Sequence, residues 1–347
     1  MRAATMRNWT LDVRDIPDPV PGSGQVLVRT RACGICGSDL HMLKHGAAMA
    51  ALGEELRKHA PPEPIETVRM ESDRDVVMGH EFCGEVVDLG PDCTNLETGD
   101  LVVSIPVAFD GAGLHTIGYS NNYPGGYAEL MVLSDLAAMK VPNGLDYRRA
   151  ALTEPLAVGI HAVAKSKIAP GDAAVVLGCG PVGLAVIDDL ARRGIEPIVA
   201  SDFSPARRAL AAKVGAHEVV DPSDERPIDA WRRVDGAKPL VIFEAVGVPG
   251  MIDQAMLMAP RDTRILVVGV CMEEDRIRPM AGIGRELNVQ FALGYDPTEF
   301  AGALQALAEG TTRYPDIVTG TVGVDGVPQA FTDLGNPEVH AKILVEP

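Results

Sequence analysis

Aromatic residues and positive charge are scarce in this sequence. Phe, Trp and Tyr make up 4% of the 347 residues, and 31 Lys and Arg stand against 48 Asp and Glu. The formal net charge of -17 would repel phosphate backbones and anionic lipid surfaces. We therefore expect neither a nucleic acid nor a membrane as a partner, and the low aromatic content argues against a substrate pocket built on ring stacking.

Long apolar runs and a disulfide framework are also missing. No uninterrupted apolar stretch approaches the roughly 20 residues of a membrane span, and residues 1–8 lack the apolar core of a signal peptide. Six cysteines scattered over the chain favour free thiols in a reducing compartment, which predicts a cytoplasmic protein. A chain of this length, 46% hydrophobic, is expected to form about two domains.

The apolar pattern divides the chain into a mostly β first half and an α/β second part. Residues 25–30 alternate at period two, and 101–103 and 127–132 are similar, which predicts short strands among turns. The second part begins with an all-apolar strand at 173–177 and a helix at 181–193. Its spacing indicates a doubly wound sheet of parallel strands joined by crossovers. Further strands are expected at 198–200, 218–220, 240–243 and 265–268.

Two segments stand apart from this division. The tail after residue 292 holds a helical stretch at 300–309 and a strand at 341–345, and it is too short for a domain, so we expect it to return to the first one. The insertion at 42–78 contains a stretch rich in Ala, Leu and Glu at 46–60, which predicts a helix that Pro61-Pro62 end. This insertion could be a lid over the substrate or a surface helix at an oligomer edge.

A glycine-rich turn, GCGPVG at 178–183, follows an apolar strand and opens a helix. In this context glycines allow a tight turn and a close approach of a pyrophosphate to the helix N-terminus. The residues expected at the dinucleotide are Gly178, Gly180, Pro181, Val182 and Gly183.

Asp202 follows at the end of the next strand, where a carboxylate can bind both ribose hydroxyls and repel a 2′-phosphate. The same residue could instead cap the helix that begins near Ser204-Pro205. Arg207 and Arg208 could hold the phosphate of NADP, but Asp202 would be a like charge beside it. The pattern therefore favours NAD over NADP.

A candidate metal site is divided between GICGSDLH at 34–41 and GHEFCG at 79–84. Cys36, His80 and a carboxylate would supply the three protein ligands of a catalytic zinc and leave a fourth position open. Cys33 and Cys36 also form a C-x-x-C pair, but without a second pair this is not a zinc ribbon.

These motifs resemble those of the zinc-dependent medium-chain dehydrogenases, the alcohol and polyol dehydrogenase family that includes sorbitol- and butanediol-dehydrogenase-like members. The resemblance implies a mostly β GroES-like catalytic domain over residues 1–155, a Rossmann domain over 156–291, and a return to the catalytic domain over 292–347. It rests on the segments 34–41, 79–93, 124–129, 154–159, 178–183 and 340–345.

The resemblance implies that Cys36 and His80 bind zinc. Glu81 would be a transient ligand or a neighbouring carboxylate that assists ligand exchange, and Glu154 stands where many relatives have a second cysteine. Glu154 would bind zinc directly or through water, although a glutamate before proline could simply cap the following helix. Asp39 matches the residue that orients the ligand histidine. Residues 104–115 contain none of the cysteines of the family's structural zinc lobe, so one zinc per chain is expected.

Catalytic and cofactor roles follow from the same resemblance. Ser38 matches a relay hydroxyl that passes the alcohol proton toward His41, although a serine at this place could also be a helix cap. Val182 is expected to back the nicotinamide ring and Val270 to line the cleft. Lys342 is expected to meet the pyrophosphate, unless it is an ordinary surface lysine.

The activity implied is NAD-dependent interconversion of an alcohol and its ketone or aldehyde, and Glu154 favours secondary alcohols, diols or polyols. Relatives form homodimers or homotetramers. The alternatives are a zinc-free quinone or enoyl reductase, whose members lack the Cys36 and His80 motifs, and a non-catalytic nucleotide-binding relative. Metal content distinguishes both alternatives from the zinc enzyme.

Overall fold

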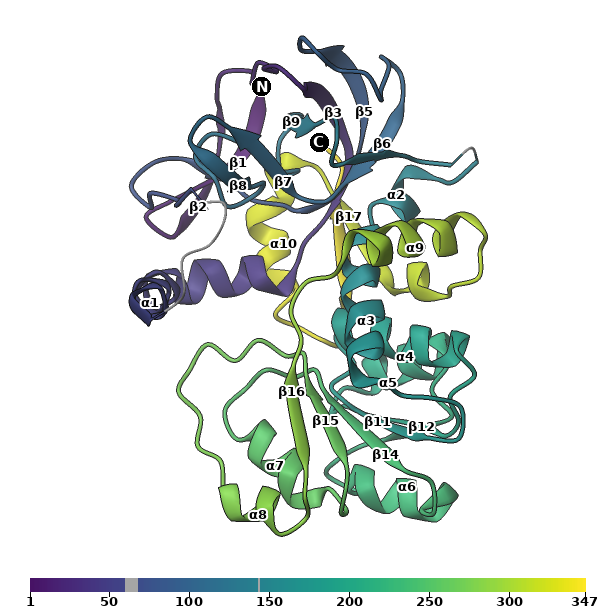
Figure 1. The fold of residues 1–347 in the computed structure, drawn as a ribbon. Helices are drawn as coiled ribbons and strands as arrows, with labels where there is room; N and C mark the ends of the chain where they lie inside the picture. The colour runs from purple at the N-terminus through teal and green to yellow at the C-terminus, as the bar shows by residue number, and fades with distance from the viewer. Residues whose placement is uncertain (60–67, 143) are drawn as a thin grey trace. The chain divides into compact units, whose positions relative to one another are not determined.

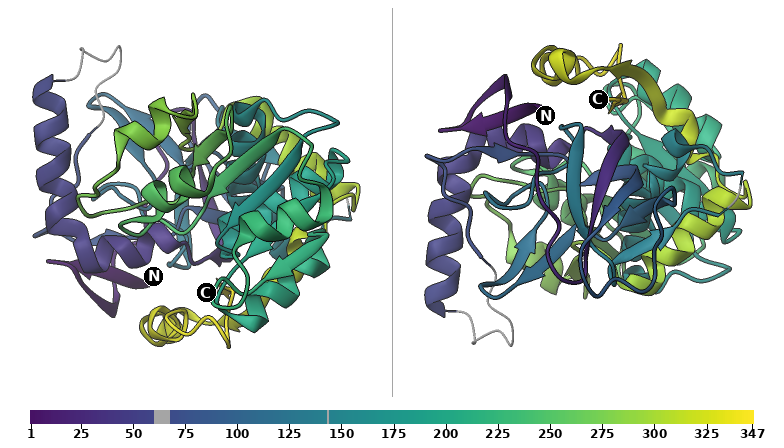
Figure 2. Two further views of the ribbon diagram at one scale, coloured as in Figure 1. Left: turned by 90° about the horizontal axis from the view of Figure 1, so that it is seen from below. Right: turned by 90° about the horizontal axis from the view of Figure 1, so that it is seen from above.

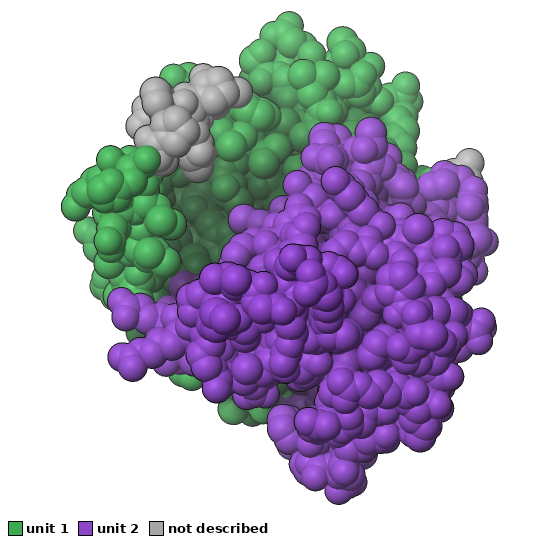
Figure 3. Space-filling view, turned by 60° about the horizontal axis from the view of Figure 1, so that its bottom comes forward, with its two compact units in different colours: residues 1–154, 320–335, 342–347 green, residues 155–319, 336–341 purple. Residues whose placement is uncertain are grey.

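The computed structural model describes residues 1–59, 68–142 and 144–347. Within these ranges the chain forms two compact units, which Figure 3 shows in different colours. Unit 1 comprises residues 1–154, 320–335 and 342–347, and unit 2 comprises residues 155–319 and 336–341.

Unit 1 is built mainly from antiparallel strands (Figure 1). Its strands are β1 (Arg2–Arg7), β2 (Thr10–Asp15), β3 (Gln25–Gly34), β4 (Val76–Val77), β5 (Glu81–Leu89), β6 (Leu101–Ser104), β7 (Val107–Asp110), β8 (Gly113–Thr116), β9 (Leu130–Ser134), β10 (Ala138–Lys140), β18 (Lys342–Val345) and, in part, β17 (Val318–Val322). The largest sheet has the order β10-β6-β5-β3-β18-β17, and β9 also pairs with β3. Strands β2-β1-β4 form a second sheet and β7-β8 a hairpin.

The strands predicted at 25–30 and 101–103 are confirmed as β3 and β6. The third prediction, 127–132, is wrong in its first residues, because β9 starts at Leu130. Tyr127 is fully buried there, and its backbone N–H donates to the carbonyl of Met78 instead of joining a strand ladder.

Helix α1 (Gly37–His59) begins well before the predicted start at residue 46. Asp39 lies in its first turn and accepts the backbone N–H of Cys36, so the metal motif itself starts the helix. Figure 2 shows α1 as two segments that meet at an angle. Gly46 leaves room for the ring of Trp9, since a Cβ there would lie 2.1 Å from that ring. The predicted stop at Pro61-Pro62 lies outside the described residues.

Unit 1 also contains short helices: α2 (Tyr147–Ala150), η2 (Val324–Gly326) and α10 (Val327–Asp333). Helix α3 (Thr153–Ser166) begins at the end of unit 1 and continues in unit 2. It covers the helix expected after Glu154.

Unit 2 is the predicted doubly wound α/β domain. Its parallel sheet has the order β13-β12-β11-β14-β15-β16, with strands β11 (Ala173–Leu177), β12 (Ile198–Ser201), β13 (Glu218–Val220), β14 (Leu240–Glu244), β15 (Arg264–Val267) and β16 (Asn288–Phe291). Its helices are α4 (Pro181–Arg192), α5 (Pro205–Val214), α6 (Pro227–Asp235), α7 (Met251–Met258), α8 (Pro279–Ile283), α9 (Pro297–Ala308) and η1 (Tyr314–Ile317). All five residues of β11 are buried, so both faces of the sheet are covered.

The tail divides between the two units. Residues 292–319, expected in the catalytic domain, fall in unit 2. There Thr312 Oγ1 donates to Asp188 of α4 at 2.7 Å, and Phe300 of α9 is buried. The strand expected at 341–345 is β18, which pairs with β3 in unit 1. None of the described helices combines the length and apolarity needed to cross a membrane.

Candidate active site

Cys36, His80 and Glu81 come together beside the central strands of unit 1. Cys36 follows β3, Glu81 begins β5, and the pairing of these strands places Gly34 opposite Glu81. One potential ligand atom from each of the three residues lies within 4.8 Å of the other two. His80 and Glu81 are buried and Cys36 is half-buried. The structure thus gathers three of the four predicted metal ligands.

Glu154, the fourth predicted ligand, is not in this set. It is half-buried in the first turn of α3, and its charge acts on the ammonium group of Lys342. Burial opposes the charge of Lys342, but Glu81, Cys36 and Glu154 together raise its pKa above the ordinary value. A direct or water-mediated role of Glu154 at a metal stays a prediction.

Asp39 is fully buried behind His80. Its carboxylate accepts the hydroxyls of Tyr127 at 2.6 Å and Tyr119 at 2.7 Å, and the backbone N–H of Cys36 at 3.2 Å. His80 Nδ1 lies 3.5 Å from Asp39 Oδ1, too poorly aligned for a hydrogen bond, and has no other partner. This arrangement fits the predicted role of Asp39 in orienting the imidazole.

The electrostatics of the Asp39 and His80 pair favour a positive charge on the imidazole. Burial opposes the charged form of His80, but Asp39 and then Cys36 raise the pKa of His80 well above its ordinary value. Burial likewise opposes ionisation of Asp39, yet the charge of His80 and the hydrogen bonds hold the pKa of Asp39 below its ordinary value. The imidazole therefore lies where a cation is stabilised.

Glu81 forms a buried ion pair with Lys342. The ammonium nitrogen lies 2.8 Å from Oε1 and 2.7 Å from Oε2, and it also donates to the carbonyl of Ile35. Both side chains are 1% exposed. Gly34 makes room for the carboxylate, because a Cβ there would lie 2.0 Å from Glu81 Oε2. The alternative of an ordinary surface lysine is wrong, because the side chain of Lys342 is buried. Its ammonium is already held by Glu81 and Ile35, which the predicted pyrophosphate contact did not foresee, and sequence reasoning missed this ion pair.

The residues present fit a zinc ion. A thiol, an imidazole and a carboxylate form the donor set, and such mixed sets are typical of catalytic zinc. The carboxylates of Glu81 and Glu154 act on the single ammonium of Lys342, which leaves an excess of one negative charge beside the thiol of Cys36. The unpartnered Nδ1 of His80 faces Asp39, as expected of a ligand histidine held by a carboxylate.

The two predicted relay residues both lie on α1. Ser38 Oγ is 3.0 Å from the hydroxyl of Tyr119, a residue that the sequence analysis did not single out. A lone tyrosine in a loop belongs to no pattern that could have marked it. His41 is half-buried, its ring centroid is 6.0 Å from that of His45, and burial, with His45 and Lys44, lowers the pKa of His41.

The cysteine-free segment at 104–115 forms the lobe of unit 1, the hairpin of β7 and β8. His115 is fully buried in this lobe. Its Nε2 lies 2.9 Å from Asp110 Oδ2, its Nδ1 is 3.1 Å from Ser120 Oγ, and its ring centroid is 4.7 Å from that of Tyr123. Protein groups therefore surround this histidine, although its Nε2 makes no well-aligned hydrogen bond with Asp110.

In unit 2 the glycine-rich turn connects β11 to α4 as predicted. Gly178 has a φ of 91°, and a Cβ on Gly183 would lie 2.0 Å from the carbonyl oxygen of Gly178. Gly180 is the N-cap of α4 and Pro181 its first residue. This strand, turn and helix have the form that receives a pyrophosphate at a helix N-terminus.

Asp202 follows β12 and is tied to the turn. Its Oδ2 accepts the backbone N–H of Cys179 at 2.8 Å, and its Oδ1 accepts that of Ser204 at 2.9 Å. The cap of α5 is Ser204, whose hydroxyl accepts the N–H of Arg207, so the alternative of Asp202 as the cap is wrong. Arg207 Nη1 is 4.0 Å from Asp202 Oδ2, whereas Arg208 binds Asp221.

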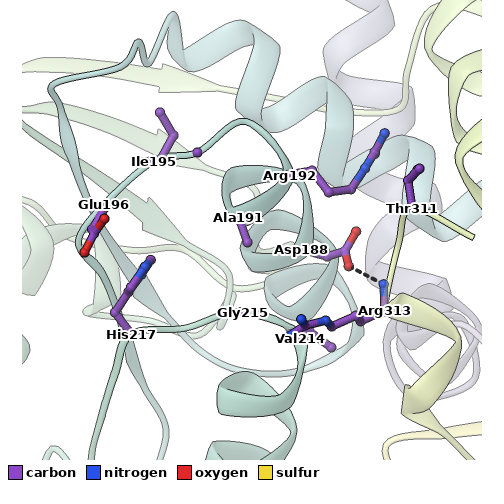
Figure 4. Close-up of a pocket in the computed structure, with 11 residues that line it drawn as sticks. Asp188, Ala191, Arg192, Ile195, Glu196, Val214, Gly215, His217, Thr311 and Arg313 are labelled. Carbon is purple, nitrogen blue, oxygen red and sulfur yellow. Dashed lines mark hydrogen bonds between the residues drawn. The ribbon is translucent and has the colours of Figure 1, made fainter.

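The remaining predicted cofactor residues lie at strand and helix ends of unit 2. Val182 is half-buried in the first turn of α4, and Val270 is 44% exposed beyond β15. A surface pocket of about 390 Å³ lies elsewhere in this unit (Figure 4). Asp188, which accepts the backbone N–H of Arg313, lines it with Arg192 and His217. None of the predicted site residues lines this pocket.

A second group of possible ligands, His161, Asp296 and Glu299, also has atoms within 4.8 Å of one another. The residues of this group already bond to one another and to a helix end. Asp296 and Glu299 form the capping box of α9, and His161 Nδ1 is 2.7 Å from Glu299 Oε2.

Comparison with known proteins matches both units to family models. The alcohol dehydrogenase GroES-like domain matches residues 22–143, and the zinc-binding dehydrogenase domain matches residues 181–309. Together they cover more than half of the chain.

The full length of the chain also matches characterised proteins. It is 32% identical to (R,R)-butanediol dehydrogenase of Bacillus subtilis over 100% of both chains, and 27% identical to bovine sorbitol dehydrogenase over 92% of this chain and 89% of that one. The crystal structure of the B. subtilis 2R,3R-butanediol dehydrogenase superposes with a TM-score of 0.82 at 31% identity, covering 100% of this chain and 99% of the other. A putative zinc-binding dehydrogenase from Sinorhizobium meliloti, bound to NADP, gives 0.82 at 28% identity over 100% and 99%. The chain therefore belongs to the zinc-dependent medium-chain alcohol and polyol dehydrogenase family.

Proposed function

We propose that this protein is a zinc-dependent dehydrogenase that uses NAD(H) to interconvert a secondary alcohol, diol or polyol and the corresponding ketone or aldehyde. The observation that carries the proposal is the convergence of Cys36, His80 and Glu81 to within 4.8 Å. The names of the relatives, butanediol and sorbitol dehydrogenase, support the substrate class.

The chain's own residues would hold one zinc ion and the cofactor. Cys36, His80 and Glu81 are the proposed ligands, Glu154 is a further ligand, directly or through water, and Asp39 orients His80. When bound, zinc supplies a Lewis acid that lowers the pKa of a substrate hydroxyl, and the nicotinamide supplies the hydride acceptor.

Ser38 and His41 are the proposed proton carriers. They are three residues apart on α1, so they share one face of the helix. Ser38 Oγ would accept the proton of the substrate hydroxyl as it releases its own proton, which would pass through the nicotinamide ribose toward His41. Because burial, His45 and Lys44 lower the pKa of His41, its imidazole is neutral near pH 7 and has a free lone pair for a proton.

NAD is the proposed cofactor because Asp202 places a carboxylate beside the glycine-rich turn. Arg207 also lies near this carboxylate, and the S. meliloti structure holds NADP, so the choice needs a test. We expect Asp202→Gly to shift the ratio of kcat/KM for NAD and NADP toward NADP. Asp221→Asn is the matched control, because it removes a carboxylate from Arg208 without touching the turn. Unchanged selectivity in Asp202→Gly would mean that Asp202 only holds the turn.

The cofactor proposal extends to Val182 behind the nicotinamide and Val270 at the edge of its site, whereas the buried ion pair with Glu81 leaves Lys342 out of it. All six cysteines are free thiols, which supports a cytoplasmic location.

A homodimer or homotetramer is proposed from the edge of the unit 2 sheet. β16 is the edge strand, and Phe291 at its end is 67% exposed. Leu293, Met280 and Ile283 are 87%, 73% and 70% exposed. An apolar, unpaired edge of this kind fits a second copy of the same edge. Light scattering of Phe291→Glu should then report a smaller particle than the unmodified protein.

The decisive experiment measures metal and turnover together. We expect about one zinc per chain by elemental analysis, NAD reduction with members of a panel of secondary alcohols, diols and polyols, and loss of both after dialysis against dipicolinate. Full activity in a metal-free preparation would support a zinc-free reductase instead. Zinc-free protein that binds NADH without turnover would support a non-catalytic relative.

A further inference from the structure

Tyr119 connects several residues of the candidate site within unit 1. It lies in the loop between β8 and β9, and its hydroxyl is 3.0 Å from Ser38 Oγ and 2.7 Å from Asp39 Oδ1. Its ring centroid is 5.4 Å from that of His80. One phenol thus touches the proposed relay hydroxyl, the carboxylate behind the ligand histidine, and that histidine itself.

The direction of these hydrogen bonds follows from counting protons. Asp39 Oδ2 accepts from the hydroxyl of Tyr127 and from the backbone N–H of Cys36, and Asp39 Oδ1 accepts from Tyr119. A carboxylate that accepts at both oxygens has no proton to return. Tyr119 therefore gives its only hydroxyl proton to Asp39, and its oxygen can only accept the bond from Ser38.

Ser38 in turn gives its only proton to Tyr119. The lone pairs of Ser38 Oγ are then left to accept a hydrogen bond from another group. Such a hydroxyl matches a substrate alcohol that presents its proton, and it cannot donate to that substrate without breaking the bond to Tyr119.

The loop around Tyr119 is fixed on both sides. Gly118 has a φ of 88°, and a Cβ there would lie 3.2 Å from the carbonyl oxygen of Gly79. On the other side, Ser120 Oγ is 3.1 Å from Nδ1 of the buried His115. The tyrosine is therefore held in place before any substrate arrives, which is the condition for preorganised catalysis.

We propose that Tyr119 is a positioning residue that holds Ser38 as the hydrogen-bond acceptor for the substrate hydroxyl. This inference rests on the proposed dehydrogenase function. It assigns the fold's cysteine-free lobe a part in catalysis, because the loop that follows the lobe carries Tyr119.

Tyr119→Phe tests the role, because it removes the hydroxyl and keeps the ring against His80. We expect kcat for alcohol oxidation to fall about tenfold, which is what one hydrogen bond contributes and less than the loss of a general base. KM should stay within about twofold of the unmodified value, and the zinc content should not change. An unchanged kcat, or a rise in KM alone, would overturn the proposal.

A double-mutant cycle with Ser38→Ala shows whether Tyr119 acts through Ser38. In the Ser38→Ala background, Tyr119→Phe should lower kcat less than about twofold. The Tm of the metal-free protein supplies a second readout that needs no activity: Tyr119→Phe should lower Tm less in Ser38→Ala than in the unmodified chain. Additive effects in both measurements would show that the two residues are independent, and would refute the inference.

Tyr127→Phe is the matched control. Tyr127 donates to the same carboxylate, at 2.6 Å, and no described contact joins it to Ser38. Its effects on kcat and Tm should be the same in the unmodified chain and in the Ser38→Ala background. If the unmodified protein shows no alcohol-dependent NAD reduction, the proposed function fails, while the Tm cycle still decides whether Tyr119 holds Ser38.

Discussion

Unit 1 contains two buried histidines, each beside an aspartate, with different surroundings. His115 has Asp110 Oδ2 at 2.9 Å from one ring nitrogen and Ser120 Oγ at 3.1 Å from the other. His80 has Asp39 at 3.5 Å from Nδ1, and its ligand atom lies within 4.8 Å of those of Cys36 and Glu81. Each histidine has one ring nitrogen close to its aspartate without a well-aligned hydrogen bond, so the difference is that only His80 faces a set of metal donors.

A histidine and an aspartate alone therefore do not define a metal site. Around His115 the neighbouring groups are a hydroxyl, one carboxylate and the ring of Tyr123. Around His80 there are a thiol and further carboxylates that exceed the nearby ammonium charge. The surplus of negative donor groups distinguishes the second site, because it is stabilised by a divalent cation.

Among the substitutions that test the difference between the His80 and His115 sites, Lys342→Met is expected to have the largest effect, on the free energy of unfolding. The substitution leaves the carboxylate of Glu81 buried without its partner, and breaking such a pair costs about 3–5 kcal/mol. Urea unfolding of the metal-free protein measures this loss. Lys140→Met is the control, since its bond to Asp100 is exposed and should contribute less than about 1 kcal/mol. Equal losses would mean that the buried pair has no special role.

His80→Ala should lower zinc affinity by more than about 100-fold, the upper range for losing a residue that only supports a ligand. NAD reduction should fall in parallel, because a direct ligand is lost. Competition with a chromophoric chelator measures the affinity. Zinc binding that survives in His80→Ala would place the metal elsewhere in the chain.

Asp39→Asn is expected to reduce zinc affinity or activity by about 10–100-fold, the usual cost of losing the partner of a ligand histidine. The amide keeps the size of the side chain but replaces an acceptor that faces Tyr119 and Tyr127 with a group that also donates. The same chelator competition gives the value. An effect as large as that of His80→Ala would argue that Asp39 itself binds the metal.

The smallest effect is expected from His115→Phe. The ring remains against Tyr123, while Ser120 and Asp110 lose their partner, at a cost of about 1–2 kcal/mol in the free energy of unfolding. Zinc content should not change. A loss of zinc in this variant would remove the distinction between the two histidines.

Much of the fold was predictable, because a strand in a sheet that is covered on both faces is a continuous apolar run in the sequence. Five of the six parallel strands of unit 2, β11 to β15, are short and mostly apolar runs, and they were located to within one or two residues. The edge strand β16 was not predicted, because Asn288 and Gln290 interrupt its apolar pattern. The start of α1 was missed because Cys36 and Asp39 serve a metal motif and a helix start at once. The division of the tail was missed because the packing of η1 on α4 and α5 is a tertiary contact with no local signal.

The candidate site shows the same limit. Cys36, His80 and Glu81 stand in motifs whose spacing marks them, and the structure brings them together. Tyr119 and Lys342 are single residues far from these motifs in sequence, and only folding brings them to Ser38 and Glu81. Their roles depend on where a loop and a closing strand lie, which composition and periodicity do not encode.

The hairpin of β7 and β8 bears on how the protein behaves without zinc. Its fold depends on His115, Asp110 and Ser120, none of which needs an ion, so depletion of zinc should leave the lobe and the loop bearing Tyr119 intact. Metal-free protein would then need only the ion, and no refolding of this lobe, to complete the candidate site.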